Sequence, residues 1–171
     1  YAAKELRRCA KLGLRGADFA VTSSVIPIWH RDWDPLWAAA QECEMPISFH
    51  TRGIPTRVPG EDDEMYREYE PQHSAVRLTV FQLAGAEIVS SLIFSEALER
   101  FPKFQFVLVE CGVSWLMYIL RRMDLEFEDL RSQINLSMKP SDYWLRQGHT
   151  TFQREPGIGD VLHVVGEDNV M

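Results

Sequence analysis

The sequence predicts an α/β protein with a parallel sheet covered by helices, and three observations support that fold class. Segments typical of helices alternate strictly with short apolar, β-prone segments along the chain. The two clearest β-prone segments, Pro46–His50 and Phe104–Gly112, each lead into a loop and then a long helical pattern. The 171 residues are 46% hydrophobic, which suffices for one core and favours a single domain over residues 1–171.

The first third of the chain predicts a helix, a strand and a second helix. Residues 2–12 are rich in Ala, Leu and Lys and are expected to form a helix that Gly13 ends. A short strand is expected over residues 16–23. Asp34 is expected to be the N-cap of the next helix, with Pro35 in its first turn.

The middle of the chain predicts a strand, a long loop, a long helix and a second strand. The first strand covers residues 46–50. Residues 51–71 form an irregular loop with prolines, glycines and an acidic cluster, which is either a functional lid or a solvated insertion. Residues 72–101 predict helix with a break near Gly85, and the second strand follows over residues 104–110.

The last third of the chain predicts three helices around one weak strand. Residues 114–130 have a strongly amphipathic helical pattern, and Ser141 is expected to cap a shorter helix over residues 139–147. A weak strand over residues 149–153 comes next, followed by a short helix over residues 156–165. A further apolar run begins at the end of the chain.

Composition excludes several classes of partner. The net charge is −7 and no basic stripe or arginine-rich run is present, so we expect no nucleic-acid partner. The sequence has no GxGxxG after a strand and no P-loop, which removes support for nucleotide binding. The apolar stretches are shorter than the ~20 residues of a membrane span, so no membrane is expected. Cys9, Cys43 and Cys111 lie far apart and indicate reduced thiols in a cytoplasmic protein.

Two architectures fit the alternation of helices and strands: a closed (β/α) barrel and an open, doubly wound sheet. A whole barrel needs roughly 250 residues, whereas this chain supplies four predicted strands and the start of a fifth. A barrel that lacks strands leaves sheet edges unpaired, and unpaired edges favour association. We therefore expect a homo-oligomer.

His50 and Glu110 are the candidate functional residues, because each ends a predicted strand. In a barrel of alternating strands and helices, the carboxyl ends of the strands open into the active site. Side chains alternate along a strand, so Leu108 and Glu110 share one face and Cys111 lies on the other, in the core. If the strands are in register, His50 and Glu110 are expected to point inward together.

The chemistry of the pair suits a metal or a proton transfer. His50 can offer an imidazole nitrogen to Zn²⁺, and Glu110 can be a metal ligand, a general base or a partner that orients an imidazole. The alternatives are a hydrogen-bonded loop histidine and a glutamate paired with Arg52 or Arg57. The remaining histidines are weaker candidates, with surface positions expected for His30 and His73, a strand start for His149 and a packed position in a helix for His163.

Several segments together resemble the amidohydrolase-2 family of metal-dependent TIM-barrel enzymes. They are DPLWAAAQECEMPISFH, LIFSEALERFPKFQFVLVECGVSWLMYILRRMDLEFEDL, KPSDYWLRQGHTTFQ and GEDNVM. The enzymes in question are similar to aminocarboxymuconate-semialdehyde decarboxylase and to hydroxybenzoate-type decarboxylases. The resemblance implies an incomplete (β/α)8 TIM barrel, from about the fourth strand to the start of the eighth. It also implies a parent enzyme that is a metal-dependent hydrolase or a non-oxidative decarboxylase.

The resemblance assigns roles to both strand-end residues. His50 matches the histidine that ends the family's fifth strand, which implies that it binds a divalent metal, with Zn²⁺ as the expected ion. The other ligands would lie before Tyr1 and just after Met171, and Asp168 precedes the strand that carries the family's aspartate. Glu110 stands where the family's decarboxylases have a catalytic histidine, and resembles a subgroup with V-E-S-G there.

The implied substrate is a small molecule, and we expect it to bear a carboxylate. Arg52 and Arg57 follow the first strand end and can bind a carboxylate by a bidentate contact, although ordinary surface charge also explains them. Two other functions stay open. One is a catalytically inactive barrel fragment that acts as a structural or interaction module, and the other is an α/β domain that binds an unrelated small ligand.

Overall fold

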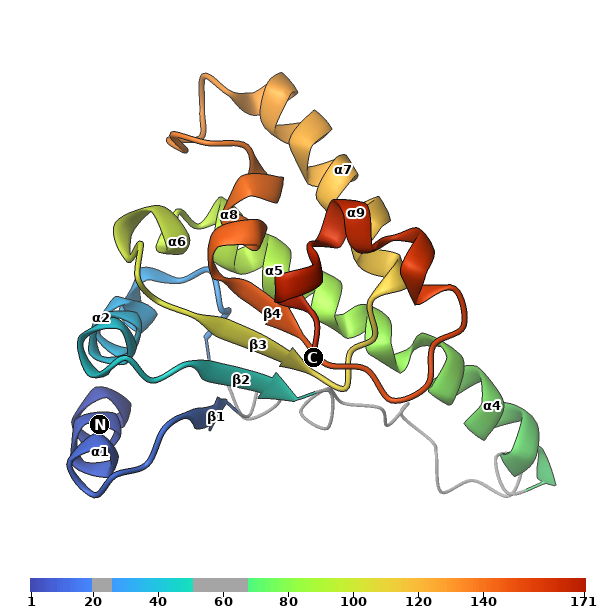
Figure 1. Cartoon of the computed structure of the whole chain (residues 1–171), viewed down its shortest axis with the longest axis horizontal. Coiled ribbons are helices and arrows are strands. Elements are labelled where there is room, and N and C mark those ends of the chain that lie inside the picture. Colours follow the sequence, from blue (N-terminus) through green and yellow to red (C-terminus); the bar gives the residue numbers. More distant parts are fainter. Residues whose placement is uncertain (20–25, 51–67) are drawn as a thin grey trace.

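A computed structural model describes residues 1–19, 26–50 and 68–171 of the chain. Its centre is a four-stranded sheet with the order β1-β2-β3-β4, so each strand lies beside the next one in sequence. The strands are β1 (Ala17–Phe19), β2 (Ile47–His50), β3 (Phe106–Val109) and β4 (Gly148–Thr150). All three pairings are parallel, and Figure 1 shows the strands side by side in one direction. The predicted α/β class with a parallel sheet is confirmed.

Helices connect the strands and cover the sheet (Figure 1). They are α1 (Ala2–Lys11), α2 (Asp34–Cys43), α4 (Glu70–Val80), α5 (Ala84–Phe94), α6 (Ala97–Arg100), α7 (Ser114–Leu130), α8 (Pro140–Gln147) and α9 (Leu162–Val165). Short 3-10 turns cover Arg31–Trp33, Phe81–Leu83, Ile158–Asp160 and Glu167–Asn169. Most of the predicted loop over residues 51–71 and the end of the strand predicted over residues 16–23 lie outside the described residues. The other expected elements are present with shifted ends, except that the helix expected over residues 156–165 is a 3-10 turn followed by the short α9.

The face of the sheet that packs on the helices carries the apolar core. Along β2 and β3, fully buried residues alternate with half-buried ones, as the period of a strand requires. Phe49 lies 6.3 Å from Trp37 of α2, and Phe106 lies 5.8 Å from Trp144 of α8, measured between ring centroids. Leu108 is also fully buried. Its face is therefore the helix-packed face, and the prediction that it is the inward face shared with His50 was wrong.

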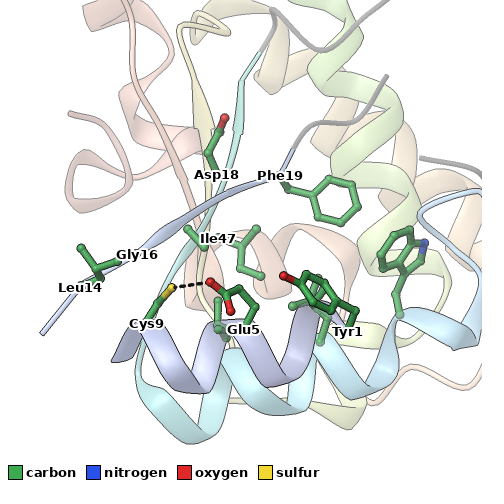
Figure 2. Close-up of a pocket in the computed structure, with 13 residues that line it drawn as sticks. Tyr1, Glu5, Cys9, Leu14, Gly16, Asp18, Phe19 and Ile47 are labelled. Carbon is green, nitrogen blue, oxygen red and sulfur yellow. Dashed lines mark hydrogen bonds between the residues drawn. The ribbon is translucent and has the colours of Figure 1, made fainter. Parts of the chain in front are cut away.

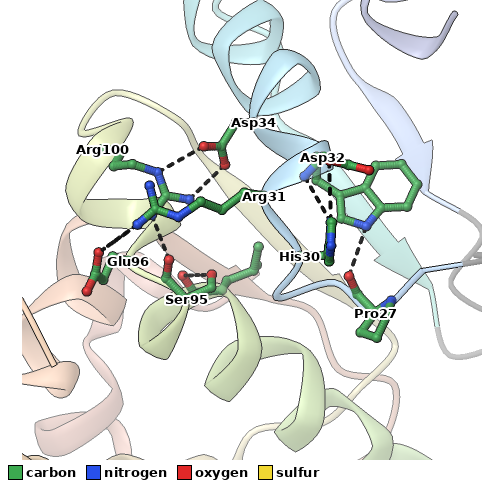
Figure 3. A network of polar contacts seen from close by, with 10 residues as sticks. Pro27, His30, Arg31, Asp32, Asp34, Ser95, Glu96 and Arg100 are labelled. Carbon is green, nitrogen blue, oxygen red and sulfur yellow. Dashed lines mark hydrogen bonds and ion pairs between the residues drawn. The ribbon is translucent and has the colours of Figure 1, made fainter. Parts of the chain in front are cut away.

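Asp34 does not cap α2, contrary to prediction. It is the first residue of the helix, and Trp33 occupies the N-cap position without a side-chain cap. The Asp34 carboxylate instead accepts two hydrogen bonds from Arg100, at 2.7 and 3.1 Å (Figure 3). The pair supplies two charge-assisted hydrogen bonds, and it ties α2 to the end of α6. Arg31 forms a second ion pair in this network, 3.2 Å from Glu96.

Ser141 does not cap α8 either. Lys139 is the N-cap residue, and Ser141 lies inside the first turn. Both the backbone N–H and the hydroxyl of Ser141 donate to the carboxylate of Asp124 in α7, at 2.9 and 2.7 Å. The acidic cap of α8 therefore comes from another helix.

The segment predicted as helix over residues 72–101 is interrupted close to Gly85, as expected, although Gly85 itself lies inside α5. A 3-10 turn over Phe81–Leu83 separates α4 from α5, and α4 extends beyond the carboxyl ends of the strands (Figure 1). α5 buries four apolar residues, whereas α4 buries none. By length and composition alone, Glu70–Phe94 could cross a membrane, because it has 25 residues and a window of mean hydropathy 1.4, of which 28% is buried. The expectation that every apolar stretch is too short does not hold for this segment.

The end of the chain adds a further position beside β4. Val170 forms a parallel bridge with Thr150, and the N–H of Met171 donates to the Thr150 carbonyl at 2.9 Å. The predicted apolar run at the chain end thus begins to extend the sheet. His163 is exposed rather than packed, because the short helix α9 turns Val161 and Val165 toward the core.

Candidate functional site

The structure brings His50 and Glu110 together at the carboxyl ends of adjacent strands. His50 is the last residue of β2, and Glu110 directly follows the last residue of β3. The Nε2 atom of His50 lies 3.3 Å from Oε2 of Glu110, with 26% and 42% of the two side chains exposed. Both side chains of the pair are therefore partly exposed to solvent.

A left-handed backbone conformation allows Glu110 to reach His50. The strand pairing matches His50 with Val109, and simple alternation would put Glu110 on the helix-packed side with Leu108. Glu110 has a φ of 57°, which ends the extended conformation of β3. A residue other than glycine in this region costs about 1–3 kcal/mol, and such residues are held by their surroundings.

The hydrogen bonds around Glu110 come from elements distant in sequence. Its backbone N–H donates to the hydroxyl of Thr151, which follows β4, at 2.8 Å. Its carbonyl accepts from the Gln82 side chain at 3.5 Å. The next part of the turn is fixed by Glu155, whose carboxylate accepts the N–H groups of Val113 and Ser114 at 2.7 and 2.5 Å. Glu155 thus caps α7 and contributes a negative charge at its N-terminus.

The sequence alone does not identify Thr151 and Glu155 as site residues. They lie 41 and 42 residues from the groups they bind, Glu110 and Val113, so no local pattern links them. The sequence feature that could indicate them is a polar loop at the end of a predicted parallel strand, because such loops gather at the carboxyl edge of a sheet, where ligands bind.

Cys111 lies in the core, as predicted, and is not a nucleophile. Burial, with the Glu110 charge as a smaller contribution, raises the pKa of its thiol to about 12. The thiolate is the reactive form of cysteine, so a thiol with this pKa is inert at neutral pH.

The other predicted residues lie elsewhere or outside the described part of the chain. Arg52 and Arg57 belong to residues 51–67, which are outside the described residues. His30 accepts the N–H of Asp32 at 3.2 Å and so caps a 3-10 turn (Figure 3). The Nε2 atom of His149 lies 3.1 Å from the side-chain oxygen of Gln105. These two histidines have structural partners.

The donor pair fits part of a metal site. An imidazole nitrogen and a carboxylate oxygen are ligands for divalent transition metals such as Zn²⁺ and Mn²⁺. Within residues 1–19, 26–50 and 68–171, no group of three or more His, Cys, Asp or Glu side chains could hold a metal ion. The described residues therefore supply two donors, fewer than the three protein ligands of a catalytic zinc site.

A cavity of about 520 Å³ lies in a different place, between α1 and the edge strand β1 (Figure 2). Apolar side chains such as Leu14, Phe19 and Ile47 form much of its wall. Asp18 also lines it, and the thiol of Cys9 contacts the carboxylate of Glu5 at 3.6 Å. Neither residue of the strand-end pair lines it.

Comparison with known proteins identifies a family and a fold. A sequence model described as amidohydrolase matches residues 1–171. No curated protein matches the sequence. The structure is similar to that of an amidohydrolase from Mycobacterium avium subsp. paratuberculosis K-10, with a TM-score of 0.75 and 16% identity over 98% of this chain and 43% of that one.

Two decarboxylases have the same arrangement. The 5-carboxyvanillate decarboxylase LigW from Sphingomonas paucimobilis gives a TM-score of 0.75 and 22% identity over 99% of this chain and 50% of that one. A dihydroxybenzoic acid decarboxylase from Polaromonas sp. JS666 was solved with bound manganese and the inhibitor 2-nitroresorcinol. It gives a TM-score of 0.71 and 20% identity over 99% of this chain and 53% of that one. The chain spans about half the length of these structures, and the likeness shows a shared fold.

Proposed function

The chain belongs to the amidohydrolase family, and from this we propose that it is part of a metal-dependent hydrolase or non-oxidative decarboxylase. The proposed substrate is a small molecule that bears a carboxylate. The observation that supports the proposal most directly is the His50–Glu110 pair, 3.3 Å apart at the carboxyl ends of parallel strands. Ligands bind at this end of the strands in barrels and in open α/β sheets.

We propose that the four strands are consecutive strands of an incomplete TIM barrel, about the fourth to the seventh. Their order in the sheet follows the sequence, as in a barrel. The bridge between Thr150 and Val170 supports an eighth strand that begins at the end of the chain. The length of the similar solved structures, about twice that of this chain, agrees with this placement.

We propose that His50 is a metal ligand and that Glu110 is a general base. A divalent ion at this position would polarise a substrate oxygen or activate water. The His50 imidazole would hold the ion through a ring nitrogen. The partly exposed Glu110 carboxylate would accept a proton through Oε2, which lies on the side of His50. Zn²⁺ and Mn²⁺ are both candidates, Mn²⁺ because a similar decarboxylase was solved with manganese.

Further parts of the proposal concern substrate and assembly. Arg52 and Arg57 are proposed to bind the substrate carboxylate, because guanidinium groups bind carboxylates in a bidentate manner. The protein is proposed to be cytoplasmic, since Cys9, Cys43 and Cys111 are all free. We also propose that it is a homo-oligomer without a nucleic-acid or membrane partner.

A second candidate function is a module that binds a small apolar ligand. The cavity beside β1 favours it, because ligand pockets of about 300–1,000 Å³ with apolar walls are typical of such sites. Binding of an apolar fluorescent probe that Phe19→Ala removes and His50→Ala leaves unchanged would support the ligand-binding module over the enzyme.

Metal binding tests the enzyme proposal. We expect the chain to bind Zn²⁺ or Mn²⁺ weakly, because the described residues supply two donors. His50→Ala should abolish this binding, whereas the control His149→Ala should retain it. Elemental analysis after dialysis and titration with the metal salt measure both. Tight, near-equimolar metal in the His50→Ala variant would show that the site lies elsewhere.

A further inference from the structure

The turn that carries Glu110 is bound to the loop after β4 at several points. We call residues 151–157 the β4 loop. The N–H of Thr151 donates to the carbonyl of Leu108 at 2.9 Å, and the Thr151 carbonyl accepts from Gly112 at 3.3 Å. These backbone bonds hold the start of the β4 loop against the end of β3 on both sides of Glu110.

The Thr151 hydroxyl adds a bond directly to Glu110. It accepts the backbone N–H of Glu110 at 2.8 Å. Glu110 has left the extended conformation, with a φ of 57°, so this N–H is the point at which the strand turns. Without the hydroxyl, a strained residue would lose a partner for its backbone donor. The bond therefore favours the one backbone conformation that directs the carboxylate toward His50.

Glu155 fixes the other end of the same turn. Its carboxylate accepts the N–H groups of Val113 and Ser114, and it packs closely over Gly112. A Cβ at Gly112 would lie 3.1 Å from Oε2 of Glu155 and 2.9 Å from Oε1 of Gln82. Gly112 has a φ of 71°, so two left-handed residues lie within the three positions from Glu110 to Gly112. Glu110 is strained in this region, whereas Gly112 tolerates it because it has no Cβ. The turn is therefore held at both ends around one strained residue.

We propose that Thr151 and Glu155 are positioning residues that hold the Glu110 carboxylate against His50. The assignment of a chemical role to this pair rests on the proposed function, whereas the positioning itself concerns geometry. In the proposed reaction, this arrangement keeps the base beside the metal ligand before a substrate binds. Through the backbone of Glu110, the β4 loop then sets the distance between the Glu110 carboxylate and the His50 ring.

The test reads out the His50 ring rather than activity. The ¹⁵N chemical shifts of the His50 imidazole are measured at one fixed pH in the metal-free chain, because they report the tautomer and the hydrogen bond of each ring nitrogen. Glu110→Gln defines the shift that accompanies loss of the carboxylate. We expect Thr151→Val and Glu155→Ala to move the His50 shifts in the same direction. Glu155→Gln, which keeps an acceptor oxygen, should have a smaller effect.

Two control variants separate positioning from general destabilisation. Thr151→Ser keeps the hydroxyl and should leave the His50 shifts unchanged. Asp124→Ala removes a carboxylate that accepts two groups at the start of α8, as Glu155 does for α7, and should lower stability without moving the His50 shifts. If Thr151→Val and Glu155→Ala leave the His50 shifts in place, or if Asp124→Ala moves them equally, the proposal is wrong.

A metal titration of the same variants keeps the two proposals distinct. MnCl₂ is the probe, and His50→Ala is the reference for loss of binding. If His50→Ala binds Mn²⁺ as the unmodified chain does, the proposed function fails, although the His50 shifts can still establish that Thr151 and Glu155 position Glu110. If His50→Ala loses Mn²⁺ and the Thr151→Val shifts equal those of the unmodified chain, the positioning proposal alone fails.

Discussion

The Nε2 atom of His50 lies 3.3 Å from Oε2 of Glu110, although the sheet pairs His50 with Val109. The contact exists because the backbone changes conformation one residue beyond β3. A continued strand would have sent the Glu110 side chain toward the helices. The site geometry thus depends on a local departure from the sheet, held by contacts from the next βα unit.

Under the proposed function, His50→Ala and Glu110→Gln should have different effects. His50→Ala should remove metal and activity together, because the proposed imidazole ligand is lost. Glu110→Gln should keep the metal and slow turnover by about 10²–10⁴-fold, the usual contribution of a general acid or base. Metal content by elemental analysis and turnover on a carboxylate substrate found by screening measure the two effects. Loss of metal from both variants would show that Glu110 is a metal ligand rather than a general base.

Gly112→Ala should destabilise the protein more than Gly13→Ala. Both glycines have a positive φ, at 71° and 88°, so both substitutions cost about 1–2 kcal/mol in backbone conformation. A Cβ at Gly13 meets nothing within 4 Å, whereas a Cβ at Gly112 meets Gln82 and Glu155. We expect Gly112→Ala to cost about 1 kcal/mol more because of this crowding. Urea unfolding midpoints measure the difference, and equal midpoints would contradict the crowding.

Cys111 should resist alkylation in the folded protein, whereas Cys9 and Cys43 should react. Burial raises the pKa of Cys111 from 9.0 to about 12, so the folded state favours the protonated thiol. Its contribution to stability is therefore complete below pH 9 and is lost as the pH rises toward 12. Iodoacetamide labelling near neutral pH, mapped by mass spectrometry with and without urea, measures the protection. Equal labelling of all three thiols without urea would contradict the burial of Cys111.

Leu14→Lys should reduce self-association, and Leu125→Lys should not. The two leucines are exposed to a similar degree, 54% and 56%, but Leu14 lines the cavity beside β1, while Leu125 lies on α7. The outer edge of β1 pairs with no strand among the described residues, and such edges favour association. Light scattering after size exclusion measures the mass. A monomeric unmodified chain with a sharp melt would contradict the expected association.

The sequence was sufficient to locate the elements because their signals are local. Apolar runs bounded by helical patterns predicted the strands that became β2 and β3 to within a few residues. The side-chain directions at the end of β3 were predicted less well. Alternation applies only while the backbone stays extended, and the extended conformation ends at Val109. Leu108 and Glu110 therefore do not share one face, contrary to prediction, even though His50 and Glu110 do meet.

The helix caps show a second limit. Asp34 and Ser141 are good cap residues by type, but their side chains have partners that lie 66 and 17 residues away, in α6 and α7. Tertiary contacts of this kind compete with the local bond, and no pattern within one helix reveals them. The same limit applies to Thr151 and Glu155. The roles of Arg52 and Arg57 stay predictions, since both lie outside the described residues.

The strand order β1-β2-β3-β4 also bears on how the protein is made. Among the described residues, β2, β3 and β4 each pair with the strand synthesised just before it, so that partner is already present when the new strand emerges. A growing polypeptide emerges from the ribosome at about 5–20 residues per second, slowly enough for such local docking. Strands β1 to β3 can therefore fold while the rest of the chain is still being synthesised. The turn at Glu110 cannot complete its contacts at that stage. Its hydrogen bonds to Thr151 and Glu155 form only after β4 and the residues that follow it have been synthesised.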